Sequence, residues 1–195
     1  IVLFIGGLNK SENQDDEGHD RKHLELPYGQ DKLISELAKV NKNIVFVNIS
    51  GNAVAMPWIK EVPGIVQGWF LGTEAGNALA NVLVGDVNPS GKLSFTFPVK
   101  LSDNGAHALG EFPGGDEVKY NEGIFVGYRW ADKNKIKPLF SFGHGLSYTT
   151  FAYGKVTADK KQINAGDKIT FSVNVKNTGS REGAEVVQLY ITDVK

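Results

Sequence analysis

Two apolar runs on either side of a helical repeat limit most strongly what this chain can fold into. Residues 1–5 read Ile-Val-Leu-Phe-Ile, and residues 44–49 are nearly as apolar, which is typical of strands covered on both faces. Between them, residues 27–40 place apolar side chains at helical spacing, with Lys39 near the end, where a cation suits the helix dipole. A strand, a helix and a second strand in this order predict a mostly parallel sheet between helical layers.

The same alternation continues further along the chain. Residues 64–70 predict a third buried strand. A helix is expected to open at Thr73 and to end at Gly85, which can adopt a left-handed C-cap conformation. Residues 93–97 predict a short strand or extended segment. Together these patterns predict an α/β domain over residues 1–100, with a mostly parallel sheet sandwiched by helices.

The remainder of the chain changes character twice. Residues 101–150 are rich in glycine, proline and aromatic side chains and show little periodicity, so we expect an extended connection packed on the first domain. Residues 169–175 alternate between apolar and polar, and residues 186–191 form another strand-like stretch after a turn signal. Residues 151–195 are therefore expected to be the start of an all-β, immunoglobulin-like sandwich, since the strands are too few for two sheets.

Charge and cysteine content exclude several classes of function. Twenty-one Lys and Arg against 22 Asp and Glu give a formal net charge of -1, so no basic field attracts nucleic acid or an anionic membrane surface. No apolar run approaches the roughly 18 residues of a membrane span. The absence of cysteine excludes disulfides, thiolate metal sites, iron–sulfur clusters and cysteine catalysis. We expect no cofactor and no bound metal.

The most polar part of the chain, residues 9–21, directly follows the first predicted strand and contains five carboxylates, one histidine and one arginine. Ligands of open α/β sheets bind beyond the carboxyl ends of the strands, so this loop lies where a site is expected. The glycine beside Glu17 would let the backbone bend and project that side chain. Neighbouring carboxylates should raise one another's pKa, as a general acid requires. Asn52 and Glu74 also follow predicted strand ends and are candidates for the same rim.

The composition of this loop leaves three interpretations open: a solvated acidic loop, a hard-cation site built from Asp15, Asp16 and Glu17, or a catalytic centre. The calcium-loop pattern is not matched. His19 and His23 lack the HExxH pattern, so a zinc site is not expected. The chain also lacks a phosphate-loop pattern and a GxSxG elbow, which argues against nucleotide binding and triad hydrolysis.

Several other charged residues are expected to be structural. Asp20 and Arg21 should form an ion pair that anchors the polar loop, and Glu122 should form a scaffold ion pair with Arg129. The three tryptophans are expected in the core or in an interface rather than on a sugar-binding platform.

Four ordered phrases together resemble glycoside hydrolase family 3, the β-glucosidase and β-xylosidase family. Residues 17–30, EGHDRKHLELPYGQ, are similar to the family's EGxDRxxLxLPxxQ. Residues 87–98 contain NPSGKL followed by FTFP, residues 120–130 read YNEGIFVGYRW, and residues 138–149 read PLFSFGHGLSYT.

The resemblance implies an architecture and a chemistry. Family members have an N-terminal barrel, then an α/β sandwich, then often a fibronectin-type-III-like domain, so this chain resembles a fragment that lacks the barrel. Retaining hydrolysis of terminal β-linked sugars uses two carboxyl groups about 5–5.5 Å apart. The resemblance assigns the Asp nucleophile to the barrel and the general acid/base to Glu17, with Glu12 and Asp16 as alternatives. A fragment with one carboxyl group of the pair would be inactive alone.

The same resemblance implies partners. The substrate would be a β-linked oligosaccharide or aryl glycoside, and the barrel of the same polypeptide would pack on this chain. A second copy of the chain, forming a homodimer, is a further possible partner. Family resemblance favours a periplasmic or secreted location, with a cytoplasmic one as the alternative. A non-catalytic carbohydrate-binding or scaffolding module is the alternative function.

Overall fold

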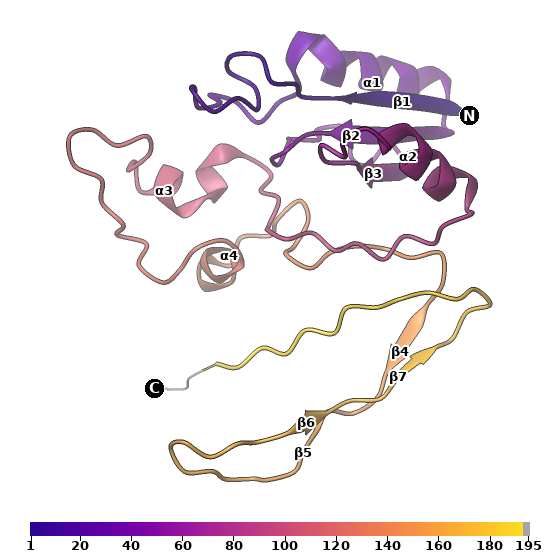
Figure 1. The fold of residues 1–195 in the computed structure, drawn as a ribbon. Coiled ribbons are helices and arrows are strands. Elements are labelled where there is room, and N and C mark those ends of the chain that lie inside the picture. The colour runs from indigo at the N-terminus through magenta and orange to yellow at the C-terminus, as the bar shows by residue number, and fades with distance from the viewer. Residues whose placement is uncertain (193–195) are drawn as a thin grey trace. The chain divides into compact units, whose positions relative to one another are not determined.

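The computed structural model describes residues 1–192, which form two compact units (Figure 1). The first unit consists of Ile1–Leu79 and Leu93–His144. The second consists of Ala80–Lys92 and the residues from Gly145 onward.

The first unit contains a parallel three-stranded sheet of order β1-β2-β3. Its strands are β1 (Val2–Gly7), β2 (Ile44–Ile49) and β3 (Gly64–Gln67). All three lie where the apolar runs predict them, and the α/β fold class is confirmed. The third strand is shorter than its apolar run.

One helix covers this sheet after a short 3-10 turn. The turn η1 spans Pro27–Gly29 and the helix α1 spans Gln30–Val40, running alongside β1 in Figure 1. Tyr28 and Gly29 both have positive φ angles, of 59° and 70°, so the predicted helix begins only after them. The fully buried side chains Ile34 and Ala38 join Phe46 of β2 in the core.

A buried indole completes this core and is held by a helix carboxylate. Trp58 has no exposed surface, and its ring meets that of Phe46 edge-on at a centroid distance of 4.9 Å. Its Nε1–H donates to Oδ1 of Asp31 at 2.7 Å, while Oδ2 of Asp31 accepts the backbone N–H of Leu26 at 3.0 Å. Burial raises the pKa of the Asp31 carboxyl above 3.8, against the lowering by these two hydrogen bonds.

The two faces of β1 differ in burial. Val2 and Phe4 pack against the core. Leu3 and Ile5, which alternate with them, are 48% and 59% exposed. This strand therefore presents an apolar row on its outer face, at one edge of the sheet.

Helix α2 (Ala75–Val84) is confirmed where the sequence predicts a helix. None of its residues is buried, although the helix is apolar on most of its surface. The predicted left-handed cap also forms, because Gly85 has a φ of 86°.

The rest of the first unit is largely irregular. Residues 93–97 form no strand: Ser94 and Phe95 lie in a bend, and Phe97 alone bridges Phe140 in antiparallel fashion. Three short helices follow: η2 (Leu101–Asp103), α3 (Gly105–Ala108) and α4 (Tyr128–Asn134). Aromatic contacts hold this segment, including Phe97 against Trp69 and Phe140.

The second unit contains two antiparallel strand pairs. β4 (Phe151–Tyr153) pairs with β7 (Val175–Asn177), and β5 (Thr157–Ala158) pairs with β6 (Phe171–Ser172). Residues 186–191 carry no strand within the described part of the chain, so the strand-like interpretation of that stretch is wrong. A strand requires a hydrogen-bonded neighbour, which alternation alone does not supply.

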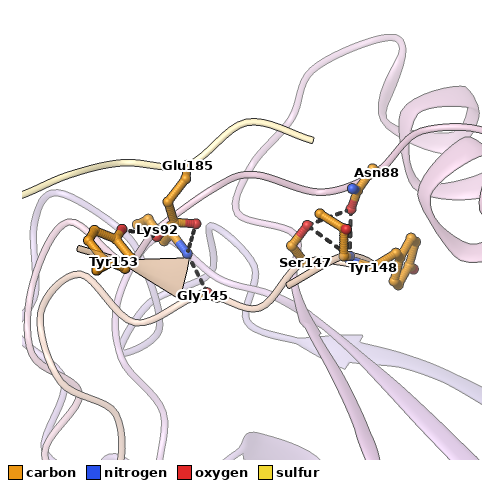
Figure 2. A network of polar contacts seen from close by, with 8 residues as sticks. Asn88, Lys92, Gly145, Ser147, Tyr148, Tyr153 and Glu185 are labelled. Carbon is orange, nitrogen blue, oxygen red and sulfur yellow. Dashed lines mark hydrogen bonds and ion pairs between the residues drawn. The ribbon is translucent and has the colours of Figure 1, made fainter. Parts of the chain in front are cut away.

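A polar network joins distant segments of the second unit (Figure 2). Oδ1 of Asn88 accepts hydrogen bonds from Ser147 Oγ at 2.9 Å and from the Tyr148 backbone N–H at 2.7 Å. Its Nδ2 donates to the carbonyl of Glu182 at 2.9 Å. One side chain thus ties together three parts of the unit.

A second part of the network is an ion pair with little exposure. Lys92 Nζ lies 3.2 Å from Glu185 Oε2, with the two side chains 13% and 16% exposed. The same ammonium group donates to the Gly145 carbonyl at 2.6 Å, and Tyr153 donates its hydroxyl to Glu185 Oε1 at 2.9 Å (Figure 2).

Within residues 1–192, no helix combines the length and the apolar character that a membrane crossing would need.

Candidate active site

A cleft of about 530 Å³ opens beside the loop that leaves β1, in the range of small-molecule sites. One wall is the polar loop, from Lys10 to Leu24. A second consists of residues 51–53, directly after β2. A third comes from the irregular segment and includes Phe95 and Phe112. The cleft therefore lies at the carboxyl edge of the parallel sheet, where the topology predicts a site.

Glu17 lines this cleft, and its side chain is exposed. Among the described residues, no hydrogen bond or ion pair engages its carboxyl group. The neighbouring Gly18 is exposed as well, and the segment around them forms bends rather than regular structure. This carboxyl group is thus free to meet a molecule in the cleft.

Asp15 lies on the same loop but is buried, with 6% of its surface exposed. Its Oδ2 accepts the backbone N–H of Gly51 at 2.6 Å, and its Oδ1 accepts Nδ2 of Asn52 at 3.2 Å. Asn52 therefore reaches the cleft rim as predicted. Glu74, in contrast, accepts a hydrogen bond from Asn77 at 2.6 Å and does not line the cleft.

Arg21 fixes the other end of this part of the loop. Its Nη1 donates to the carbonyl of Ala53 at 2.9 Å. Partial burial lowers the pKa of the guanidinium, while the charges of Asp15 and Glu25 raise it. The predicted ion pair between Asp20 and Arg21 is wrong, since no such pair forms in residues 1–192. Arg21 anchors the loop through a backbone carbonyl instead.

Asp16 and His19 form an exposed pair next to Glu17. His19 Nδ1 lies 3.0 Å from Asp16 Oδ2, and its Nε2 lies 3.8 Å from Oε1 of Glu12. The hydrogen bond from His19 lowers the pKa of Asp16, and the hydrogen bond to Asp16 raises the pKa of His19. The expectation that clustered carboxylates raise one another's pKa is therefore wrong for Asp16, because its hydrogen bond with His19 favours the charged carboxylate.

The two alternative acids are both engaged with this histidine. Glu12 has a side chain that is 69% exposed and does not line the cleft. Asp16 lines the cleft but is hydrogen-bonded. No group of three or more His, Asp or Glu side chains within residues 1–192 is arranged to hold a metal ion.

The structure also tests the expectations for the aromatic and charged residues outside the loop. Trp58 lies in the core, as predicted. The predicted ion pair between Glu122 and Arg129 does not form in the described residues, where Arg129 instead lies over the ring of Tyr128, 5.8 Å from its centroid.

The third wall of the cleft was not foreseen as part of a site. Phe112 is 41% exposed and stacks on His107 at a centroid distance of 4.6 Å. The only sequence signal is the aromatic and glycine content of residues 101–150, which predicts packing rather than a place in the cleft. A cleft lined by both aromatic side chains and a free carboxyl group suits a ligand with polar and apolar faces.

Comparison with known proteins matches this chain to a glycosidase family. The family described as glycosyl hydrolase family 3 C-terminal domain matches residues 1–148. The chain is 55% identical to beta-glucosidase BoGH3A of Bacteroides ovatus, over 99% of this chain and 26% of that protein. It is 50% identical to thermostable beta-glucosidase B of Acetivibrio thermocellus, over 100% of this chain and 25% of that protein.

Solved structures give the same result. The chain superposes on a beta-glucosidase from Kluyveromyces marxianus in complex with glucose with a TM-score of 0.80 and 44% identity, covering 91% of this chain and 20% of that one. For DesR, a beta-glucosidase from Streptomyces venezuelae in complex with D-glucose, the TM-score is 0.81 and the identity 40%, covering 91% and 22% of the two chains.

The fold is that of the C-terminal α/β region of glycosidases. The chain belongs to glycosyl hydrolase family 3. It spans about a quarter of the length of the curated relatives it matches.

Proposed function

We propose that this chain is the C-terminal part of a retaining exo-β-glycosidase of the β-glucosidase type, which removes terminal β-linked sugars from oligosaccharides or aryl glycosides. Glu17 is its general acid/base. The observation that carries the proposal is a carboxyl group with no partner among the described residues, on the rim of a cleft of about 530 Å³. Family membership and the names of the relatives support it.

In this mechanism Glu17 acts twice. It first donates its proton to the glycosidic oxygen as the bond to the leaving group breaks, while an Asp nucleophile bonds to the anomeric carbon. It then accepts a proton from the water that releases the sugar from that covalent intermediate. The nucleophile would come from a barrel domain of the same polypeptide, at a carboxyl separation of about 5–5.5 Å. A polypeptide limited to these residues should be inactive.

We also propose a division into an α/β domain over residues 1–100, a connection packed on it, and a fibronectin-type-III-like domain from residue 151. The antiparallel pairs β4–β7 and β5–β6 support the last part.

The test is Glu17→Gln in the complete polypeptide that carries this domain. We expect kcat/KM on cellobiose to fall by about 10²–10⁴-fold, the range of general acid–base catalysis. On 2,4-dinitrophenyl β-glucoside the loss should be small, because that leaving group departs without protonation. Azide should restore turnover of the aryl glucoside by Glu17→Ala and give a glycosyl azide, since an anion then replaces the missing base.

Matched variants decide among the carboxylates of the loop. Glu12→Gln and Asp16→Asn test the alternatives, and Glu117→Gln, an exposed residue outside the cleft lining, is the control. Normal turnover of cellobiose by Glu17→Gln would remove Glu17 from the role. If the isolated chain bound cellobiose in a calorimetric titration while Glu17→Gln kept full activity, a carbohydrate-binding module would be the better description.

A further inference from the structure

The loop around Glu17 is held to the sheet at both of its sides. Before Glu17, the buried carboxylate of Asp15 accepts hydrogen bonds from the backbone of Gly51 and the side chain of Asn52. After it, Arg21 donates to the carbonyl of Ala53. Both anchors therefore end on the same short segment, which directly follows β2.

Between the two anchors, contacts are few and exposed. The pair of Asp16 and His19 is internal to the loop and does not reach the sheet. Glu17 itself makes no contact that would fix its side chain to the described part of the chain. Its place over the cleft is consequently set by the backbone, and the backbone is set by the anchors.

The contact between Asp15 and Gly51 is short and closely packed. Its Oδ2 lies 2.6 Å from the N–H of Gly51, a short charge-assisted hydrogen bond. The segments pack closely here: a Cβ at Gly51 would lie 3.1 Å from the ring of Phe70, a tight contact, and 3.5 Å from Asp15 Oδ2. Phe70 in turn lies under the ammonium group of Lys10, 4.5 Å from the ring centroid, so another part of the loop meets the same surface.

We propose that Asp15 is a positioning residue for the general acid/base, holding the segment that carries Glu17 against the end of β2 so that its carboxyl group stays aimed into the cleft. Arg21 assists from the other side. This inference rests on the proposed function of Glu17. Asp15 acts through the loop, because its two oxygens accept hydrogen bonds from Gly51 and Asn52.

The physical basis is the steep dependence of proton transfer on geometry. A displacement of a catalytic group by about 1 Å can cost about 10²-fold in rate. Replacing Asp15 by Ala removes both hydrogen bonds and lets the loop move away from Gly51. Replacing it by Asn keeps one oxygen acceptor for Gly51 but puts an NH2 donor toward the amide of Asn52, so the loop should be partly held.

The experiment measures kcat/KM of Asp15→Ala and Asp15→Asn in the complete polypeptide on two substrates. On cellobiose, whose leaving group needs a proton, we expect a loss of about 100-fold for Asp15→Ala and a smaller loss for Asp15→Asn. On 2,4-dinitrophenyl β-glucoside, whose leaving group needs none, both variants should stay within about threefold of the parent. On cellobiose, kcat/KM of the impaired variants should depend less steeply on pH than that of the parent, on both the acidic and the basic side of the profile.

Two controls separate positioning from folding. The matched variant Asp86→Asn changes an exposed aspartate whose carboxyl group makes no hydrogen bond or ion pair within the described residues, and it should leave activity on both substrates unchanged. The thermal midpoint of each variant shows what fraction is folded at the assay temperature. An equal loss on both substrates means a merely structural role and overturns the proposal, as does full activity of Asp15→Ala on cellobiose.

The outcome with Glu17→Gln keeps the two proposals apart. If Glu17→Gln is impaired on cellobiose but Asp15→Ala is not selectively impaired, the positioning role is wrong and the role of Glu17 stands. If Glu17→Gln is fully active on cellobiose, the role of Glu17 fails and the positioning role fails with it.

Discussion

The ion pair between Lys92 and Glu185 should contribute strongly to the stability of the second unit. The ammonium and carboxylate groups lie 3.2 Å apart with 13% and 16% of their side chains exposed. Removing one partner of a buried pair costs about 3–5 kcal/mol, because the other charge stays buried without a counter-charge. Lys92→Met also removes the hydrogen bond to the Gly145 carbonyl. The remaining exposure of Glu185 and its hydrogen bond from Tyr153 offset part of the cost.

We therefore expect Lys92→Met to lower the free energy of unfolding by about 2–3 kcal/mol. Urea denaturation followed by circular dichroism gives this value for the parent, for Lys92→Met, for Glu185→Gln and for the double variant. Glu185→Gln removes the carboxylate charge. The double variant should therefore be more stable than Lys92→Met alone, in which that charge has lost its counter-charge. The coupling between the two positions should be about 1–3 kcal/mol.

The control is Lys155→Met, an exposed lysine of the same unit, which should change the free energy of unfolding by no more than about 0.5 kcal/mol. A coupling below about 0.5 kcal/mol between positions 92 and 185 would refute the reasoning, because it would mean that the two charges do not sense each other.

Two further predictions concern pH. The pKa of Asp31 is raised in the folded protein, so its contribution to stability is present below the unfolded value near 3.8 and is lost as pH rises through the folded value. Relative to Asp31→Asn, the parent should thus gain stability on acidification from pH 7 toward pH 3 in urea titrations, and a pH-independent difference would contradict this. The pKa of His19 is raised by Asp16, so its contribution is present below 6.5 and is lost as pH rises through the folded value. In an NMR titration of the His19 ring, Asp16→Asn should move the midpoint downward, and an unchanged midpoint would rule out the pairing.

The sheet could be predicted from sequence because burial on both faces leaves a direct mark on composition. Residues 1–5 and 44–49 are apolar enough to show their strands, and they became β1 and β2. The start of α1 was less visible, since the positive φ angles of Tyr28 and Gly29 delay the helix without changing the apolar periodicity. The β region was predicted least well, because strand formation at residues 186–191 depends on a partner and not on the segment itself.

The candidate site was partly foreseeable for a similar reason. Topology places the loop after β1 at the carboxyl edge of the sheet, and the family resemblance of residues 17–21 pointed to Glu17 within that loop. The anchors could not be named from sequence, because the hydrogen bond from Gly51 to Asp15 joins segments far apart in the chain and leaves no local pattern. Phe112 was missed for a different reason. It lies in an irregular segment, which has no periodicity from which the directions of its side chains could be predicted.

The outer face of β1 bears on how this chain behaves at high concentration. Leu3 and Ile5 form an apolar row on a strand that lies at one edge of the three-stranded sheet within the described residues. Such a strand can pair with the same strand of another copy and so promote aggregation. Light scattering of a purified preparation should therefore rise with concentration, and changing both residues to lysine should keep the solution clear.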